Sequence, residues 1–574
     1  MLIRTLNEDL KAVARELEYP EDKISVTYSD RPDLCQFQCN GAFGLAKVLR
    51  RAPLQIAQAL ADKFSERYTY AKAEVAPPGF LNFVVTDEAF SDLLKEFLSD
   101  PRCGVEKTDA PRKIVIDYGG PNIAKPLHVG HLRSAVIGEA LKRLCRFLGH
   151  DVTGDIHLGD WGTQMGLVIA GLEERYDLSY YFGSDAPKPE ITLADLNEVY
   201  PMASARSKED EAFRAKAQEI TFRLQQHEEG YYPLWQDICA TSIADIKKDY
   251  AALDVEFDLW NGESTCDKYV DPMIDSFIEK GFAYESDGAL IMDVAEETDE
   301  KPMPPILLRK SNGAQIYAST DLATIVERME TIDPDEMWYV VDARQGLHFE
   351  QLFRCARKTG LVKEDTVLQH VPFGTVNGTD GKPFKTREGG TMKLKDLIAI
   401  ISDAAGKQLS EGALALDPEA PRKVGCAALK YGDLVCNRNK NYIFDIDKFV
   451  QFDGKTGSYL LYSLVRINSL LAKAGQPDLS LGLKIEDKEE REVLMKMQLL
   501  VTAYHQAFEE KLPSFLCEAA YDLANAFNVF YGSHKIVGES DPLRRNTWLT
   551  LSAAVGNLLK QTLTVLGMET VPAM

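Results

Sequence analysis

The hydrophobic positions in the first hundred residues follow two different periods. Five apolar residues near the N-terminus recur with the spacing of one helix face, and they are Leu2, Leu6, Leu10, Val13 and Leu17. The later run GFLNFVV, residues 79–85, has the apolar and aromatic composition of a strand. Helical segments flank this run, and SDPRCG closes the unit at residue 104. We therefore predict a small α+β domain over residues 1–104.

Beyond residue 112 the pattern changes to short apolar runs that alternate with helix-periodic segments. The runs are KIVIDY (residues 113–118), GHDVTGDIHLGDWG (149–162), GALIMDV (288–294) and EMWYVVDA (336–343). Strands that alternate with helices are typical of parallel βαβ units. We therefore predict a parallel-sheet α/β domain over residues 105–400. A charged, mostly helical stretch at about residues 172–280 is predicted to be an insertion in this domain.

After GGTMKLKDLI the strand-like runs stop, and residues 401–574 are almost entirely helix-periodic. The segment GKTGSYLLYSLVRINSLLAKAG, residues 454–475, is typical of them. A chain of 574 residues is too long for one hydrophobic core. The predicted fold class is therefore a multidomain α/β protein with an N-terminal α+β domain, a helical insertion and a C-terminal all-α helical bundle.

Composition narrows the compartment and the class of protein. Charges are scattered through the N-terminus, which lacks the apolar core of a signal peptide, and no run approaches 18 apolar residues. We therefore expect a cytoplasmic protein without a membrane segment. The ten cysteines show neither CxxC nor zinc-ribbon spacing. This favours buried, reduced thiols and no structural metal.

The net charge of −23 argues against bulk electrostatic attraction to nucleic acid. A nucleic-acid binder of this composition must concentrate its positive charge locally. Residues 41–73 do so, because six basic residues face only Asp62 and Glu66; the six are Lys47, Arg50, Arg51, Lys63, Arg67 and Lys72. A solvated helical face explains this segment equally well.

The stretch DYGGPNIAKPLHVGHLRS, residues 117–134, is the strongest candidate for chemistry. Asp117 ends a predicted strand, GGPN is turn chemistry, and a helix is predicted to begin near Leu127. Such a junction favours anions through backbone N–H groups and the helix dipole. His128 and His131 would share one face of the first turn and could reach one phosphate.

Gly130, between the two histidines, would let a base or ribose approach the backbone. Two alternatives stay open on spacing alone. The histidines could be metal ligands, although only His150 and His157 lie near enough in sequence to add a third. They could also be structural histidines whose hydrogen bonds are satisfied.

The full string GPNIAKPLHVGHLRS resembles the HxGH signature of class I aminoacyl-tRNA synthetases, and that of arginyl-tRNA synthetases in particular. Further stretches resemble the same family in order along the chain. They are CQFQCNGAFGLAK and PPGFLNFVV for the N-terminal domain, DIHLGDWGTQMG, YASTDLA and VVDARQGLHFEQ for the catalytic core, GKPFKTREGGTMKLKDL for the second ATP loop, and KYGDLVCNRNKNYIFD and YLLYSLVRI for the helical domain. The resemblance thus spans the whole chain. It implies a tRNA-binding N-terminal domain, a class I Rossmann catalytic domain and an anticodon-binding helical domain.

The resemblance also implies a reaction. ATP, accompanied by Mg²⁺, would activate L-arginine to arginyl-adenylate and pyrophosphate, and the arginine would pass to the 3′ end of tRNA(Arg). The attacking carboxylate is already a nucleophile at neutral pH, so catalysis consists of positioning and of stabilising charge on the phosphates. No membrane partner and no resident metal are expected, and the family implies a monomer.

The resemblance assigns site residues by position in this chain. Those for catalysis are His128, His131, Lys125 and Lys385. Those for ATP are Pro121, His128, Gly130, His131, Gly159, Asp160, His348, Lys382, Lys385 and Arg387. Those for arginine are Asp117, Asn122, His131, Tyr317, Asp321 and Gln345. Carboxylates and an aromatic ring suit a planar guanidinium. The alternative for Asp321 is that it only caps its helix.

The second ATP loop departs from the class signature KMSKS, because PFKTR has Thr386 at the usual second lysine. The cations that could replace this lysine are Lys125, Lys382, Lys385 and Arg387, and we favour Lys125 and Lys385. The glycines that follow predict a loop that closes over ATP. We also expect arginine activation to require tRNA.

Two residue groups are expected to bind tRNA. The first is Lys47, Arg50 and Arg51, in the basic segment of the N-terminal domain. The second is Tyr459, Tyr462 and Arg466, which share a helical face suited to unstacked bases. The alternative for the second group is a core face with one arginine at its rim.

Three other functions would use parts of the same sequence pattern. A small HxGH nucleotidyltransferase would have no use for the helical domain or the second loop. A P-loop is excluded, because the position five before Gly454 in DGKTG is Phe449. The remaining alternative is a catalytically inactive tRNA-binding relative, which should have lost pocket residues that are present here.

Overall fold

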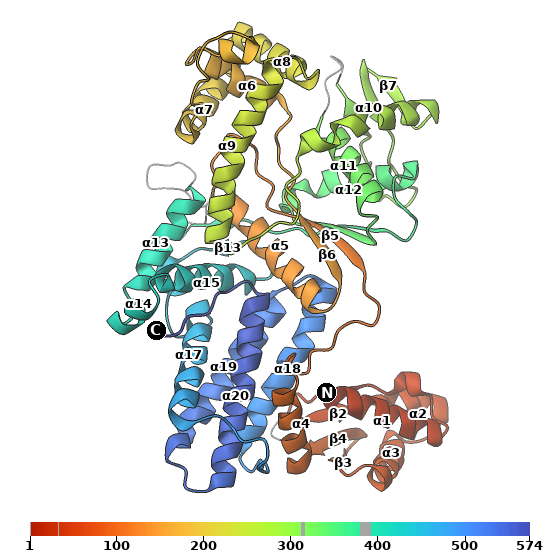
Figure 1. Cartoon of the computed structure of the whole chain (residues 1–574). Helices are drawn as coiled ribbons and strands as arrows, with labels where there is room; N and C mark the ends of the chain where they lie inside the picture. The colour runs from red at the N-terminus through yellow and green to blue at the C-terminus, as the bar shows by residue number, and fades with distance from the viewer. Residues whose placement is uncertain (1, 32–33, 311–315, 379–380, 382–391) are drawn as a thin grey trace.

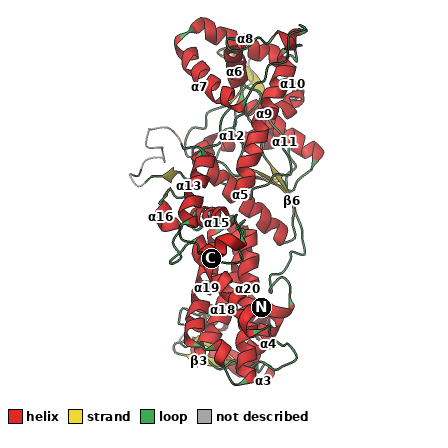
Figure 2. Cartoon of the chain, turned by 60° about the vertical axis from the view of Figure 1, so that its left-hand side comes forward, coloured by secondary structure: helices red, strands yellow, loops and turns green. Residues whose placement is uncertain are grey.

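The computed structural model describes residues 2–31, 34–310, 316–378, 381 and 392–574. Its elements form an elongated molecule (Figures 1 and 2). The N-terminal domain lies at one end beside the C-terminal helices, the parallel sheet lies in the middle, and the helical insertion lies at the other end. No helix of the described segments is long and apolar enough to cross a membrane.

The N-terminal domain packs helices against a four-stranded antiparallel sheet of order β1-β2-β4-β3. Its elements are α1 (Leu2–Glu16), β1 (Val26–Tyr28), β2 (Phe37–Cys39), α2 (Gly41–Leu49), α3 (Pro53–Arg67), β3 (Ala71–Ala76), β4 (Phe80–Val85) and α4 (Asp87–Ser99). The predicted N-terminal helix and the strand near residues 79–85 are confirmed. Leu81, Phe83 and Val85 alternate into the core, as a half-buried strand requires.

The central sheet is parallel and has the order β11-β10-β5-β6. Its strands are β5 (Lys113–Asp117), β6 (Asp151–Asp155), β10 (Glu336–Tyr339) and β11 (Val367–His370), with α5 (Val129–Phe147) joining the first two. Alternate residues face two separate apolar clusters, Val115 and Met337 on one side, Ile114 and Trp338 on the other. The predicted parallel α/β domain is confirmed.

One predicted strand belongs to a different sheet. The run GALIMDV forms β8 (Ala289–Met292), but β8 pairs antiparallel with β7 (Ala283–Ser286) and β9 (Ile306–Arg309). The expectation that it alternates within the parallel sheet is therefore wrong. Asp287 and Gly288 both have positive φ, 50° and 76°, which is the geometry of a two-residue hairpin. This Asp-Gly pair was the signal for the antiparallel pairing.

The insertion is helical, as predicted. It contains α6 (Thr163–Glu173), α7 (Leu193–Glu209), α8 (Glu211–Gln225), α9 (Tyr231–Ala252) and α10 (Glu263–Glu279), with a short 3-10 turn, η2 (Ser179–Phe182). In Figure 1, α6, α7 and α8 form the yellow group, and α9 runs from them back toward the C-terminal half. Two further helices, α11 (Tyr317–Thr331) and α12 (Gly346–Thr359), lie against the sheet.

The C-terminal region is almost wholly helical, which confirms the predicted bundle. Its helices are α13 (Leu394–Gly406), α14 (Glu411–Leu416), α15 (Ala420–Leu434), α16 (Ile446–Phe449), α17 (Gly457–Ala474), α18 (Lys488–Glu510), α19 (Ser514–Ser533) and α20 (Pro542–Val565). The exception is β13 (Tyr442–Ile443), which pairs with β12 (Val376–Asn377) from the catalytic half. The bundle also contacts the N-terminal domain, where Arg491 pairs with Asp87 at 2.7 Å.

Candidate active site

The turn before α5 uses both histidines of the HxGH stretch as acceptors for its own backbone. His128 is the N-cap of α5, and its Nδ1 accepts from the Gly130 N–H at 3.0 Å. Nδ1 of His131 accepts from the His128 N–H at 3.1 Å. A neutral imidazole that accepts at Nδ1 carries its proton on Nε2. Because the ring centroids lie 4.0 Å apart, the turn presents two adjacent Nε2–H donors.

Both histidines stay neutral at physiological pH. Burial lowers the pKa of His128, and Lys125 lowers it further. Burial lowers the pKa of His131 to about 3, with His128 as the next cause. The helix begins at Val129, two residues later than the sequence predicts. The two rings are therefore uncharged hydrogen-bond donors at a helix N-terminus, where the helix dipole favours an anion.

The geometry of the two rings separates the alternatives that the sequence left open. The structural interpretation holds for Nδ1 of each ring, while neither Nε2 has a hydrogen-bond partner among the described residues. The metal interpretation gains no support. Across the described ranges, one group of three side chains lies close enough to hold an ion, and it consists of Asp487, Glu490 and His534, far along the chain. Even there, the Arg544 guanidinium donates to Asp487 at 3.0 Å.

The side chain of His128 explains why residue 130 is a glycine. A Cβ at this position would lie 2.7 Å from Cε1 of His128, closer than real Cβ contacts allow. The glycine therefore makes room for the capping ring of His128. The sequence had predicted room for a nucleotide there, which stays a prediction.

The described residues that follow the predicted second ATP loop lie beside this turn. The Val129 N–H donates to the Met392 carbonyl at 3.0 Å, and the Leu394 N–H donates to the Leu127 carbonyl at 2.9 Å. Met392 and Leu394 are thereby hydrogen-bonded to the HxGH stretch. Four residues of the prediction lie outside the described residues, and they are Lys382, Lys385, Thr386 and Arg387.

Lys125, on the other side of the histidines, contacts the helical insertion. Its ammonium lies 4.5 Å from the ring centre of Tyr200 on α7. This cation–π contact holds a positive charge next to His128, whose pKa it lowers. The insertion thus supplies a side chain that positions a candidate catalytic cation.

Asp117 ends β5 at the carboxyl edge of the sheet and is already paired within the chain. Its Oδ2 accepts from Nη2 of Arg328 at 2.6 Å, and Oδ2 of Asp155 accepts from the same atom at 2.7 Å. Burial raises the pKa of Asp117, and the Arg328 guanidinium opposes this rise. The carboxyl ends of parallel strands are where α/β sheets bind ligands.

Three further predicted residues come from α11 and the start of α12. Tyr317 is the first residue of α11 and is 62% exposed. Asp321 follows one turn later, and its Oδ2 lies 2.6 Å from Nε2 of His348. Gln345 is exposed and immediately precedes α12. The alternative that Asp321 caps its helix is wrong, because Ile316 is the N-cap residue.

The loop after β6 lies against the turn after β5. The Gly159 N–H donates to the Pro121 carbonyl at 3.1 Å, and Asn122 bridges to Gly159. Asp160 is buried, and its two oxygens accept from the Ser264 N–H at 3.0 Å and the Ser264 hydroxyl at 2.6 Å. Asp160 thereby secures the start of α10, a contact that sequence reasoning did not foresee.

Sequence reasoning missed Glu263, the first residue of α10. Its side chain is buried, and burial raises its pKa to about 7; His157 opposes the rise, and Asp160 and Asp321 add to it. Burial, with Glu263 as the next cause, also raises the pKa of Tyr317. The charge of Glu263 therefore acts on Tyr317, and the charge of Asp321 acts on Glu263. The sequence carried no signal for it, because it lies in a charged stretch that predicts solvated helices.

Of the residues expected to contact tRNA, those in the N-terminal domain are exposed. Lys47 and Arg50 lie at the end of α2, and Arg51 donates to the Tyr19 hydroxyl at 2.8 Å. Two other basic residues of that segment pair with acids, Lys63 with Glu66 at 2.9 Å and Arg67 with Glu16. A solvated helical face and a docking patch therefore both remain compatible with this domain.

In the C-terminal bundle, Tyr459, Tyr462 and Arg466 do share one face of α17. Arg466 donates to the Tyr462 hydroxyl at 2.8 Å and to the Asn528 side chain at 2.5 Å. Asn528 in turn donates to the Tyr459 hydroxyl at 2.9 Å. The three side chains are half-buried, so their face is neither fully core nor fully exposed.

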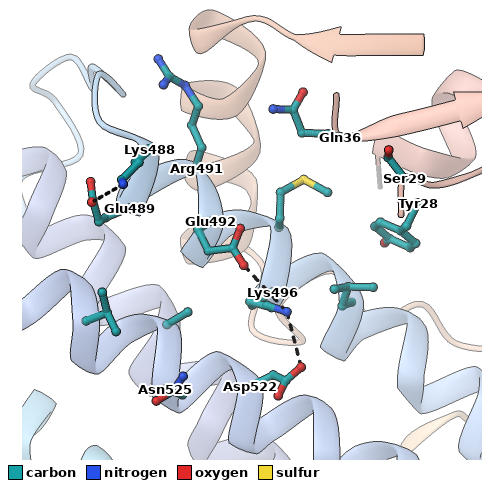
Figure 3. A pocket seen from close by; sticks show the side chains of 14 residues that line it. Tyr28, Ser29, Gln36, Lys488, Glu489, Arg491, Glu492, Lys496, Asp522 and Asn525 are labelled. Atoms are coloured by element: carbon teal, nitrogen blue, oxygen red, sulfur yellow. Dashed lines mark hydrogen bonds and ion pairs between the residues drawn. The ribbon is translucent and has the colours of Figure 1, made fainter. Parts of the chain in front are cut away.

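A cavity of about 890 Å³ lies elsewhere, between the N-terminal domain and α18 and α19 (Figure 3). Tyr28, Ser29 and Gln36 line one side, and residues of α18 and α19 line the other. Lys496 pairs there with Glu492 at 3.8 Å and with Asp522 at 3.4 Å. None of the described residues predicted for catalysis, ATP or arginine lines this cavity, and the HxGH turn does not contribute to it.

Comparison with known proteins follows the same order of domains. Three family models match, described as the Arginyl tRNA synthetase N terminal domain (residues 2–85), tRNA synthetases class I (R), catalytic domain (residues 93–446) and the DALR anticodon binding domain (residues 460–574). The arginine–tRNA ligase of Alkaliphilus oremlandii is 46% identical and covers 99% of both chains. That of Agathobacter rectalis is 43% identical over 99% of this chain and 98% of its own.

Solved structures show the same fold. The arginyl-tRNA synthetase of Plasmodium falciparum aligns with a TM-score of 0.81 at 24% identity, covering 100% of this chain and 99% of its own. The Thermus thermophilus arginyl-tRNA synthetase aligns with a TM-score of 0.80 at 22% identity, covering 100% of both chains. These two likenesses concern the fold alone.

Proposed function

The chain belongs to the arginyl-tRNA synthetase family, and from this membership we propose how its residues carry out the reaction. The activity is arginine–tRNA ligation, a ligase reaction that consumes ATP. The arginine carboxylate attacks the α-phosphorus, the bond to the bridging oxygen breaks, and pyrophosphate leaves. A hydroxyl at the tRNA 3′ end then attacks the arginyl carbonyl carbon, and AMP leaves.

His128 and His131 stabilise the charge that develops on the ATP phosphates. The observation that carries this proposal is the use of both Nδ1 atoms as backbone acceptors, which fixes the proton on each Nε2. Because the low pKa values keep both rings neutral, they donate hydrogen bonds without titrating near neutral pH. Preorganised donors of this kind need no rearrangement as the charge forms.

Lysines supply the positive charge around the phosphates. Lys385 and Lys125 are the proposed catalytic cations, with Lys382 and Arg387 as further ATP contacts. Support comes from Lys125, next to His128, and from the hydrogen bonds between residues 392–394 and the HxGH stretch. Pro121, Gly159, Asp160 and His348 complete the proposed ATP contacts. The Mg²⁺ ion that usually accompanies ATP is also a proposal.

The arginine pocket lies at the carboxyl edge of the sheet. Asp117 and Asp321 bind the guanidinium as charged acceptors, Tyr317 covers it with an aromatic ring, and Gln345 adds a neutral acceptor. Asn122 and His131 contact the amino-acid backbone of the substrate. Glu263 joins this group as a third acid, because its charge interacts with Tyr317 and Asp321.

The two terminal domains bind tRNA. Lys47, Arg50 and Arg51 are proposed contacts of the N-terminal domain, and Tyr459, Tyr462 and Arg466 of the helical domain. The DALR match supports anticodon binding by the bundle. We place the domain bounds at 1–104, 105–400 and 401–574, with the insertion at about 172–280, and we expect a monomer that acts in the cytoplasm and needs tRNA for activation.

Arginine-dependent exchange between ATP and pyrophosphate, run with and without tRNA(Arg), tests the reaction. Lysine and glutamine serve as control substrates. Exchange with arginine only, and only in the presence of tRNA, supports both the substrate and the tRNA requirement. Exchange without tRNA keeps the substrate and ends the tRNA requirement. No exchange with arginine, with tRNA still bound, would favour the catalytically inactive alternative.

A further inference from the structure

Arg328 is a buried guanidinium that lies over three strands of the sheet. It comes from the last turn of α11, and 2% of its surface is exposed. The strand register places Tyr339, Asp117 and Asp155 side by side on β10, β5 and β6. Nη2 of Arg328 donates to both carboxylates, at 2.6 and 2.7 Å, and its guanidinium carbon lies 5.4 Å from the Tyr339 ring centre.

Arg328 offsets the repulsion between two buried carboxylates. Two carboxylates on neighbouring strands at the same register repel each other, and burial disfavours the ionised form of both. Among the described groups, Arg328 is the cation that both carboxylates contact. Asp117 also faces His157, whose charge would lower its pKa, whereas Asp155 raises it. The charge of Asp321 also raises the pKa of Tyr339, after burial and against the opposing charge of Arg328.

The nitrogens of the Arg328 guanidinium differ in their hydrogen bonding. Nε and Nη1 are buried and have no hydrogen-bond partner within the described chain, and neither has Oδ1 of Asp155. Nη2 of Arg328 donates to both carboxylates, and the guanidinium also interacts with Tyr339, where it opposes the rise in pKa that burial causes. Arg328 donates to Oδ2 of Asp117. Oδ1 of Asp117 has no hydrogen-bond partner in the described segments. Oδ1 is therefore the atom left for a ligand.

We propose that Arg328 is a positioning residue for arginine recognition, which fixes Oδ2 of Asp117 so that Oδ1 meets the substrate guanidinium. The two carboxylates and Arg328 carry a net charge of −1, and one substrate cation neutralises it. Oδ2 of Asp117 then accepts a hydrogen bond from Arg328, and Oδ1 accepts one from the guanidinium of the substrate. This inference rests on the proposed role of Asp117 in the arginine pocket.

A purely structural role would make the same contacts, so the test must separate stability from recognition. In the double variant Arg328→Met, Asp155→Asn, the buried cation and one buried anion are removed together, which avoids leaving Asp155 unpaired. Asp155→Asn alone is the matched control, because it keeps the Arg328–Asp117 contact. Asp117→Asn tests the underlying assignment. The readouts are melting temperature and the KM and kcat of pyrophosphate exchange for the full-length protein with tRNA.

The double variant should raise KM for arginine about tenfold or more, as loss of a charge-assisted contact does, with KM for ATP unchanged. Its kcat/KM for arginine should also decline at a higher pH than in the wild type, because Asp117 without its cation protonates more readily. Asp155→Asn should stay near the wild-type KM. Arg328→Lys, which keeps the charge, should restore part of the affinity, and it is the variant to use if the double variant does not fold.

Two results would overturn the inference, and they can be told apart. If Asp117→Asn raises KM for arginine but a folded double variant, or Arg328→Lys, has the wild-type KM and pH profile, then Arg328 is structural only. If Asp117→Asn itself leaves KM for arginine unchanged, the assignment of Asp117 to the pocket is wrong, and the role of Arg328 falls with it.

Discussion

A methyl group at residue 130 would displace the His128 ring and leave the rest of the fold untouched. A Cβ there would lie 2.7 Å from Cε1 and 2.8 Å from Nδ1 of His128. The ring must therefore turn away and lose its 3.0 Å bond from the backbone N–H of residue 130. One such bond contributes about 1 kcal/mol net to stability, and alanine gains about 1 kcal/mol over glycine in a helix. The two effects offset each other, so Gly130→Ala should melt close to the wild type.

In contrast to the melting temperature, the exchange rate of Gly130→Ala should fall strongly. A donor aimed at developing negative charge is worth about 10²–10³ in rate, so misplacing the Nε2–H of His128 should lower the exchange rate by about 100-fold. Gly412→Ala is the matched control, because Gly412 is also the second residue of its helix and a Cβ there meets nothing within 4 Å. The assay is arginine- and tRNA-dependent pyrophosphate exchange beside thermal unfolding. Wild-type exchange by Gly130→Ala would refute the role given to the oriented ring.

Three further outcomes follow from the same contacts. The pKa of His131 is about 3, so protonation would remove the Nδ1 acceptor that orients its ring only as the pH falls toward 3. Exchange at saturating substrate should therefore show no step from His131 between about pH 5.5 and 7.5, and a His131-dependent step near 6.5 would contradict this. Glu263 has a pKa of about 7, so kcat/KM for arginine should rise as the pH rises through 7. Glu263→Gln should abolish that rise. A step that persists in this variant would show that another group titrates. Arg133→Met would leave Asp433 buried without its 2.7 Å partner, and should lower the free energy of unfolding by about 3–5 kcal/mol. Denaturant unfolding measures this loss. The double variant Arg133→Met, Asp433→Leu should recover most of it.

Local patterns in the sequence were enough to predict the elements that carry the site. The strand ending at Asp117, the turn after it and the helix that contains His131 each have their own composition signal. Strands β1 and β2 were missed because three residues are too few to show a period. The hairpin of β8 was missed although Asp287 and Gly288 mark it, because the apolar run was read without its turn.

Contacts between distant segments could not be predicted in this way. Arg328 lies 211 residues from Asp117 in sequence and looks like an ordinary basic residue near a helix end. Only the register of three parallel strands brings its partners together. Glu263 likewise gains its raised pKa from burial and from neighbours in other segments. The sequence supplied these residues' chemistry, and tertiary packing supplied their environment.

The central claim is that arginyl-adenylate forms between the HxGH turn and the carboxyl edge of the sheet. A crystal structure of the chain with tRNA(Arg) and a non-hydrolysable sulfamoyl analogue of arginyl-adenylate tests it most directly. We predict that Nε2 of His128 and of His131 face the group that replaces the phosphate, and that Oδ1 of Asp117 and the Asp321 carboxylate contact the guanidinium. An analogue bound with its guanidinium away from both carboxylates, or with the rings turned so that Nδ1 faces it, would contradict the claim.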